Sequence, residues 1–201
     1  MTNGAGRAGK AALRARLAAD RTRVADDVRA AEATALTRHL ERIGIGSATV
    51  CAYAPVGSEP GSVGMLDALL RHAHRVLLPV ARLSTENTAV ALQWGEYRPG
   101  SLVPARWGLL EPPAPWLPAT ALAEADVVLL PALAVDRHGV RLGRGRGFYD
   151  RSLPLRATRT RLVAVVRDAE LVDELPSEPH DVPMTHVLTP ALGLASLPIR
   201  E

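Results

Sequence analysis

The chain is short of several residue types, and each shortage narrows the classes of protein to which it can belong. Its single cysteine, Cys51, excludes an internal disulfide and a zinc site built from cysteines. The apolar run around Cys51, ATVCAYA, predicts a small core residue. Aromatic residues make up only 3% of the 201 residues, and the formal net charge is +3. Nucleic-acid binding usually requires a more basic face or stacking aromatics, so we expect no nucleic-acid partner.

Long apolar runs are missing as well. A membrane-spanning helix needs ~20 consecutive apolar residues, and no run approaches that length. The first residues, MTNGAGRAGKAALRARLAADR, contain no apolar segment of the kind found in signal peptides. We therefore expect no membrane association and a cytoplasmic location. An apolar content of 47% with 22% charged residues is ordinary for a globular protein, and we expect residues 1–201 to form one monomeric domain.

The apolar pattern alternates between helical spacing and short continuous runs. Helical spacing covers residues 10–43 and 63–72, and a further helix is expected to begin near Gly147. Residues 99–118, with six prolines, are expected to be loop-rich. The short runs predict strands at 48–53, 75–80, 90–94, 126–133, 162–166 and 186–189. This alternation predicts a three-layer α/β domain with a mostly parallel sheet.

The most informative stretch is PALAVDRHGVRLGRGRGFYDR, at residues 131–151. A buried strand leads through a turn at Gly139 into Gly143, Gly145 and Gly147, which alternate with arginines. Glycines let backbone N–H groups approach a ligand, and the helix expected to follow points its positive end at the same place. A glycine-rich surface loop without a ligand is the simpler alternative. The stretch also matches neither of the standard nucleotide-binding motifs, GxxxxGK[ST] and GxGxxG. The order of elements nevertheless predicts a polyphosphate-binding loop.

Lys10 is the only lysine among the 24 basic residues, and Arg14 follows it by four positions. Both cations therefore lie on one face of the first predicted helix. Like charges at this spacing mildly destabilise an isolated helix, and a bound polyanion would reverse that effect. The residues alone leave a polyanion contact and an accidental lysine equally open. We expect Lys10 to be exposed and to contribute little to folding.

The stretch at residues 131–151 resembles the signature of the 5-formyltetrahydrofolate cyclo-ligase family, also called methenyltetrahydrofolate synthetases. Weaker similarities follow in the family's order: KAALR at 10–14, AYAPVGSEP at 52–60, RWGLLEP at 106–112 and HDVPMTHVLTP at 180–190. The resemblance implies an α/β/α domain with helices on both faces of the sheet. It also implies ATP- and Mg²⁺-dependent conversion of 5-formyltetrahydrofolate, polyglutamylated or not, to 5,10-methenyltetrahydrofolate, with release of ADP and phosphate.

The resemblance further implies roles for individual residues. Contacts to ATP are expected from Lys10, Arg14, Arg141, Leu142, Gly143, Arg144, Gly145, Arg146, Gly147, Phe148 and Tyr149. Among these, the residues expected to stabilise charge during the reaction are Lys10, Arg14, Arg144 and Arg146. Contacts to the folate are expected from Tyr53, Ala54, Glu59, Trp107 and Phe148. Asp150 and Asp181 are expected to bind Mg²⁺, which usually takes one or two protein carboxylates.

Several of these residues also suit a plainer role. A first-turn helix acid is favoured by the helix dipole, which explains Asp150 without a metal. Asp181 is also explained as a turn residue, without a role in metal binding. Glu59 follows a strand, where α/β proteins tend to place ligands, but it also suits a solvated loop. Trp107 suits core packing, although a pterin needs a flat apolar wall of this kind.

The chain departs from the family's pattern at two places. Family members usually continue with an acidic residue and a threonine after the glutamate matched by Glu59, whereas this chain has Pro60, Gly61 and Ser62. The resemblance therefore does not imply the shape of this loop. Phe148 replaces the more usual tyrosine, which removes a hydroxyl and keeps the ring.

The implied reaction needs no enzyme nucleophile, and its catalysis would rest on positioning and charge stabilisation. Two other classes stay open on the sequence alone. A phosphate-ligand isomerase on a related α/β scaffold would use a phosphate site without ATP hydrolysis, and a non-catalytic folate or nucleotide sensor would bind without turnover. Folate-dependent release of ADP separates the three.

Overall fold

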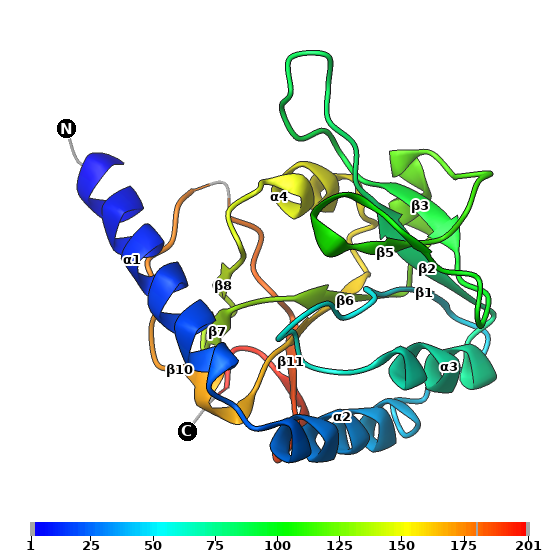
Figure 1. The fold of residues 1–201 in the computed structure, drawn as a ribbon, viewed down its shortest axis with the longest axis horizontal. Coiled ribbons are helices and arrows are strands. Elements are labelled where there is room, and N and C mark those ends of the chain that lie inside the picture. The colour runs from blue at the N-terminus through cyan, green and yellow to red at the C-terminus, as the bar shows by residue number, and fades with distance from the viewer. Residues whose placement is uncertain (1–2, 180, 200–201) are drawn as a thin grey trace.

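The computed structural model describes residues 3–179 and 181–199, and a seven-stranded sheet forms its centre (Figure 1). The strand order is β12-β11-β9-β6-β1-β2-β3. The bounds are β1 (Thr49–Cys51), β2 (Arg75–Val80), β3 (Gln93–Glu96), β6 (Val127–Pro131), β9 (Arg161–Val165), β11 (His186–Thr189) and β12 (Gly193–Ser196). The pairs from β11 to β2 are parallel, and only the edge strands β12 and β3 are antiparallel. The predicted mostly parallel sheet is confirmed.

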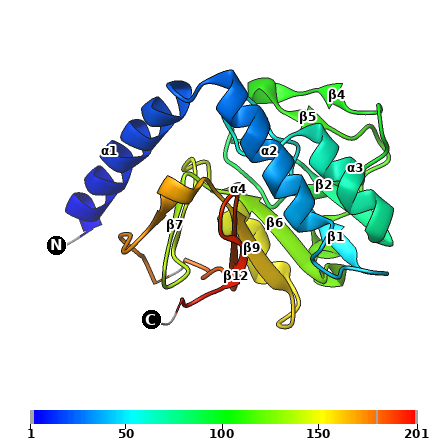
Figure 2. The ribbon, with the colours of Figure 1, turned by 90° about the horizontal axis from the view of Figure 1, so that it is seen from below.

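Helices cover both faces of this sheet. Figure 1 shows α2 (Asp26–Leu40) and α3 (Val63–His72) on one side and α4 (Phe148–Ser152) on the other. α1 (Asn3–Thr22) stands apart from these layers, as Figure 2 shows from below. Short 3-10 helices lie at Arg106–Gly108, Ala119–Glu124, Leu153–Leu155 and Asp168–Glu170. The α/β/α arrangement implied by the family resemblance is therefore present.

The two sheet faces divide the core, as the two-residue period of a strand requires. In β6, Val128 and Leu130 belong to the cluster on the α4 side, while Val127 and Leu129 belong to the cluster under α2 and α3. All four side chains are buried. This burial on both faces explains why β6 is a continuous apolar run instead of an alternating one. Cys51 is buried in the same core, as predicted, and burial raises the pKa of its thiol.

The predicted helix over residues 10–43 is wrong, because two helices occupy this region. α1 ends at Thr22, and α2 begins at Asp26. Asp26 and Asp27 lie in the first turn of α2, where acidic side chains interact favourably with the helix dipole. The apolar spacing that joined the two segments depended on Val28, which is 45% exposed. No proline or glycine marks the break between them.

Several short strands were not predicted. β7 (Ala134–Asp136), β8 (Arg141–Leu142) and β10 (Leu171–Val172) form a second, three-stranded sheet. Within the loop-rich residues 99–118, β4 (Val103–Pro104) pairs with β5 (Leu110–Glu111). β3 begins three residues later than predicted. Two- and three-residue strands leave no periodic signal in a sequence. The second sheet matters for the site, because β8 leads directly into the glycine loop.

α1 is attached to the second sheet by apolar contacts and by a buried ion pair. Leu17 packs with Leu133 and Leu142 in a small separate cluster. At the end of α1, Arg21 is 2% exposed; its Nε and Nη2 each donate to a carboxylate oxygen of Glu170 at 2.7 Å. Arg21 also donates to the carbonyl oxygen of Ala132. These contacts hold the helix that carries Lys10 and Arg14.

We predict that Arg21→Ala lowers the free energy of unfolding by about 3–5 kcal/mol, because it leaves the Glu170 carboxylate buried without its partner. The measurement is urea denaturation followed by circular dichroism. Arg23→Ala is the matched control, since its pair with Asp20 is exposed and such pairs contribute at most about 1 kcal/mol. Equal losses in the two variants would contradict the anchoring role of Arg21.

Candidate functional site

A cavity opens at the carboxyl ends of the central strands. Its floor includes Tyr53 after β1, Pro79 in β2, and Pro131 and Ala132 at the end of β6. The chain proceeds from β1 to β2 on one side and from β6 to β9 on the other, so the strand order reverses between β1 and β6. Open parallel sheets bind their ligands at such a point. α1, the glycine loop and residues 178 and 181 complete the walls.

Every residue predicted for the site lines this one cavity. The residues come from parts of the chain that are far apart in sequence, between Lys10 and Asp181, and the fold brings them together. They form two groups. We call the predicted contacts to ATP and the metal the polar half of the cavity: the glycine loop, Lys10, Arg14, Arg141, Asp150 and Asp181. We call the predicted folate contacts the aromatic half: Tyr53, Ala54, Glu59, Trp107 and Phe148.

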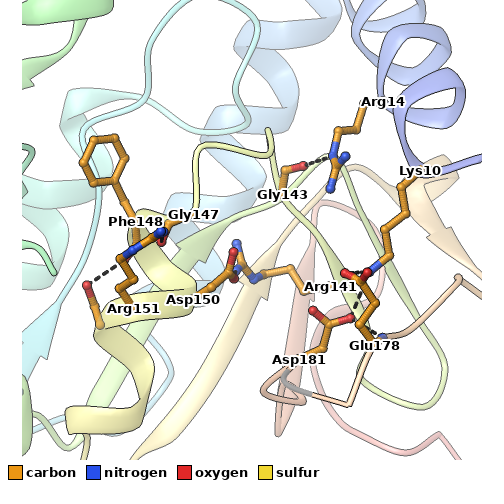
Figure 3. Close-up of polar contacts among 11 residues, drawn as sticks. Lys10, Arg14, Arg141, Gly143, Gly147, Phe148, Asp150, Arg151, Glu178 and Asp181 are labelled. Carbon is orange, nitrogen blue, oxygen red and sulfur yellow. Dashed lines mark hydrogen bonds and ion pairs between the residues drawn. The ribbon is translucent and has the colours of Figure 1, made fainter. Parts of the chain in front are cut away.

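The glycine loop, residues 143–147, joins β8 to α4. Gly145 and Gly147 have φ angles of +84° and +79°, in the left-handed region that side chains disfavour. A Cβ at Gly145 would lie 3.4 Å from the guanidinium of Arg14. Arg14 in turn donates from Nε to the carbonyl oxygen of Gly143 at 2.9 Å (Figure 3). The loop is therefore shaped by its glycines and tied to α1.

Two cations of the polar half, Lys10 and Arg141, are paired with carboxylates. Lys10 Nζ lies 3.0 Å from Asp181 Oδ2 and 3.2 Å from Glu178 Oε2, as Figure 3 shows. Arg141 Nη2 lies 3.0 Å from Asp150 Oδ1. Burial lowers the pKa of Arg141, and the charge of Asp150 opposes that shift. Both predicted metal-binding aspartates thus lie beside a positive charge.

Two features of this pairing differ from the sequence-based expectations. Lys10 was expected to be exposed, yet only 7% of its surface is exposed, because its side chain lies between Glu178 and Asp181. Glu178 was not predicted as a site residue. The available signal was its position three residues before Asp181, and its backbone N–H donates to Asp181 Oδ2 at 2.8 Å. Glu178 therefore helps to orient the aspartate.

Mg²⁺ would find suitable donors in this half of the cavity. Carboxylate oxygens are the ligands that Mg²⁺ prefers, and one or two are enough when phosphates and waters supply the rest. Within residues 3–179 and 181–199, no three His, Cys, Asp or Glu side chains converge as a ready-made metal cluster. Asp150 and Asp181 each neutralise a cationic side chain, Arg141 and Lys10, so Mg²⁺ would compete with these side chains for the carboxylates.

Two aromatic rings form one wall of the aromatic half. The rings of Trp107 and Phe148 lie 5.6 Å apart between centroids and are tilted by 57°. Trp107 has a φ angle of +61° and is 38% exposed, so it does not pack into the core. The guanidiniums of Arg146 and Arg106 lie 4.5 and 5.4 Å from the Trp107 ring centroid, within the range of a cation–π contact. Phe148, the departure from the family's tyrosine, keeps its ring in this wall.

The loop that carries Glu59 also lines the cavity. Tyr53 donates its hydroxyl to the carbonyl oxygen of Pro60 at 2.6 Å, and the N–H of Val56 donates to Glu59 Oε2 at 3.1 Å. Gly61, in the segment that departs from the family's pattern, has a φ angle of +101° and packs against Met65. Burial raises the pKa of the Glu59 carboxyl, while the charge of Arg144 and the Val56 N–H lower it. Glu59 is thus a constrained acid, not a solvated one.

In the part of the chain that the structure describes, no helix is long and apolar enough to cross a membrane.

Comparison with known proteins agrees with the geometry. Residues 7–190 match the model of the 5-formyltetrahydrofolate cyclo-ligase family. A 5-formyltetrahydrofolate cyclo-ligase of Mycolicibacterium smegmatis is 58% identical over 188 residues, which cover 94% of this chain and 97% of the relative. A protein of the same name from Escherichia coli is 34% identical over 145 residues, covering 71% and 78%.

Solved structures share the fold. The structure of Aquifex aeolicus 5,10-methenyltetrahydrofolate synthetase superposes with a TM-score of 0.77 and 22% identity, covering 96% of this chain and 94% of that one. A 5,10-methenyltetrahydrofolate synthetase from Mycoplasma pneumoniae gives a TM-score of 0.63 and 18% identity, covering 89% and 96%. The family match, the identity to the M. smegmatis relative and the order of motifs along the sequence agree, and this chain belongs to the 5-formyltetrahydrofolate cyclo-ligase family.

Proposed function

We propose that the protein converts 5-formyltetrahydrofolate to 5,10-methenyltetrahydrofolate, with ATP converted to ADP and phosphate. The observation that carries the proposal is the meeting of two unlike surfaces in one cavity. A pair of aromatic rings and a fixed carboxylate in the same cavity suit a pterin, and a glycine loop with cations beside it suits a triphosphate. The expected single domain over residues 1–201 and the expected monomeric, cytoplasmic state remain predictions.

The chemistry requires that the formyl oxygen become a leaving group. Transfer of the γ-phosphoryl group to this oxygen gives an iminium phosphate, and ADP leaves. Attack of folate N10 on the formyl carbon closes the ring, N10 loses its proton to solvent, and the carbon–oxygen bond then breaks to release phosphate. The first step exchanges one phosphorus–oxygen bond for another, and the later steps replace a carbon–oxygen bond by a carbon–nitrogen bond. No step needs an enzyme nucleophile, so catalysis rests on placing the reacting atoms and stabilising charge.

The residues of the polar half would place the triphosphate and stabilise its charge. Lys10, Arg14 and Arg141 would neutralise the triphosphate, and the backbone N–H groups around Gly145 would contact its oxygens. Asp150 and Asp181 would hold Mg²⁺, which when bound supplies further charge neutralisation at the phosphate oxygens. Arg144 and Arg146 extend from the loop toward the aromatic half and would stabilise charge at the transferred group.

The reaction itself is the first test. We expect purified protein to form 5,10-methenyltetrahydrofolate from the 5-formyl compound only when both ATP and Mg²⁺ are present, measured by product absorbance and ADP release. Omission of either component and addition of EDTA are the controls. Folded protein that makes no product would contradict the proposal. In that case, binding without turnover would favour a sensor, and phosphate-dependent isomerisation would favour the isomerase alternative.

Lys10 provides a more local test. We expect Lys10→Met to raise the KM for ATP by about tenfold or more, since a hydrogen bond to a charged group contributes roughly 1.5–3 kcal/mol. The KM for the folate should stay nearly constant. Arg16→Met is the matched control, because Arg16 lies on the same helix and is exposed. A lower melting temperature together with normal kinetics would show that Lys10 is only structural.

The glycine loop can be tested in the same way. We expect Gly145→Val to abolish ATP binding at every Mg²⁺ concentration, because a Cβ there forces a disfavoured φ and meets Arg14. Gly100→Val is the matched control, since Gly100 has a φ of +73° but open space around it and lies outside the cavity. The measurement is titration calorimetry with the β,γ-imido analogue of ATP. Wild-type affinity in Gly145→Val would exclude a phosphate-binding role for the loop.

A further inference from the structure

One ion pair joins the two halves of the cavity. Arg144 projects from the glycine loop of the polar half, and its Nε lies 3.1 Å from Oε1 of Glu59 in the aromatic half. Lys10, Arg21 and Arg141 also line the cavity and form ion pairs, and the carboxylates in those pairs are not part of the aromatic half. The Glu59–Arg144 pair is therefore placed so that occupancy of one half can affect the other.

The two partners are held very differently. The Glu59 side chain is 9% exposed, and the Val56 N–H fixes its second oxygen from behind. The Arg144 side chain is 51% exposed and extends from a position between two glycines. Among the residues that the structure describes, Arg144 has no second hydrogen-bond or ion-pair partner. Arg144 is therefore free to change position, whereas Glu59 is held in place and needs a hydrogen-bond donor or a cation at that position.

The proposed ligands each require one member of this pair. A pterin presents a ring N–H and an amino group side by side, which is the donor pattern that a guanidinium presents to a carboxylate. A triphosphate requires cations, and Arg144 is a cation that Glu59 already neutralises. Either ligand, if it binds alone, must separate Glu59 from Arg144. If both bind, that separation costs free energy only once.

We infer that the Glu59–Arg144 pair couples the two substrates, so that the folate releases Arg144 toward the triphosphate and each substrate strengthens binding of the other. The inference rests on the proposed function, because it assigns the pterin to Glu59 and the phosphates to the arginine loop. Glu59 is then a positioning residue for the ATP half as well as a folate contact. Thermodynamic linkage requires that the two substrates affect each other by the same factor.

The coupling is measured by titration calorimetry on the whole protein. The β,γ-imido analogue of ATP, with Mg²⁺, is titrated with and without saturating 5-formyltetrahydrofolate, so that no turnover occurs. We expect the folate to tighten analogue binding by about fivefold or more, the lower range of measured coupling between sites. The reverse titration should show the same factor. Equal affinities with and without folate would overturn the inference.

Variants identify the pair as the source of the coupling. Glu59→Gln keeps an acceptor for the Val56 N–H and releases Arg144, so it should bind the ATP analogue more tightly than the wild type when folate is absent. Added folate should then bring no further gain. Because Glu59→Gln also removes a negative charge, the double variant Glu59→Gln/Arg144→Met is compared with Arg144→Met alone. These two should bind the analogue equally if the effect runs through Arg144.

A difference between those two variants would show that Glu59 acts on the triphosphate directly, which would overturn the inference. Asp173→Asn is the control, because the Arg137–Asp173 pair also joins an arginine Nε to a carboxylate but is exposed and lies outside the cavity; its coupling factor should equal that of the wild type. Turnover of the wild type separates the two proposals. A wild type that forms product but shows no coupling refutes this inference alone, whereas one that binds both ligands and forms no product refutes the proposed reaction.

Discussion

Charge balance inside the cavity is the constraint on which the rest of the site depends. Two like charges ~8 Å apart repel by about 2 kcal/mol at an effective dielectric constant of ~20, and the cavity walls carry five arginines and a lysine. Carboxylates from distant segments oppose this repulsion: Glu59, Asp150, Glu170, Glu178 and Asp181. The protein can keep an anion-binding surface folded without its anion because each of these acids supplies a temporary counter-charge.

The same balance explains why α1 lies where it does. Few apolar residues attach it to the second sheet, and its polar residues make the remaining contacts at three points along its length. Lys10 reaches the acids at 178 and 181, Arg14 reaches the Gly143 carbonyl, and Arg21 reaches Glu170. A helix fixed mainly by charges is also a helix whose position depends on which charges are present in the cavity.

The sequence predicted the features that depend on local patterns. The apolar runs of β6 and β9 and the alternating glycines before α4 predicted the sheet and the loop, because burial and backbone conformation directly restrict which residues are possible there. Family resemblance predicted which residues would share the cavity. The break between α1 and α2, the burial of Lys10 and the part played by Glu178 were missed. The burial of Lys10 depends on partners that are distant in sequence, so no spacing or composition signals it. The other two left only weak local signals: the adjacent acids Asp26 and Asp27 at the start of α2, and the three-residue spacing between Glu178 and Asp181.

The separation between Lys10 and Asp181 has a consequence for the newly made protein. Their contact joins residues 171 positions apart, and β11, the last parallel strand of the sheet, lies beyond both. α1 is synthesised before the segments that carry Glu170, Glu178 and Asp181, so for most of translation Lys10 and Arg21 have none of the carboxylates that neutralise them in the folded chain. The nascent helix therefore presents unbalanced positive charge, and the polar half of the cavity is completed only after nearly all of the polypeptide has been made.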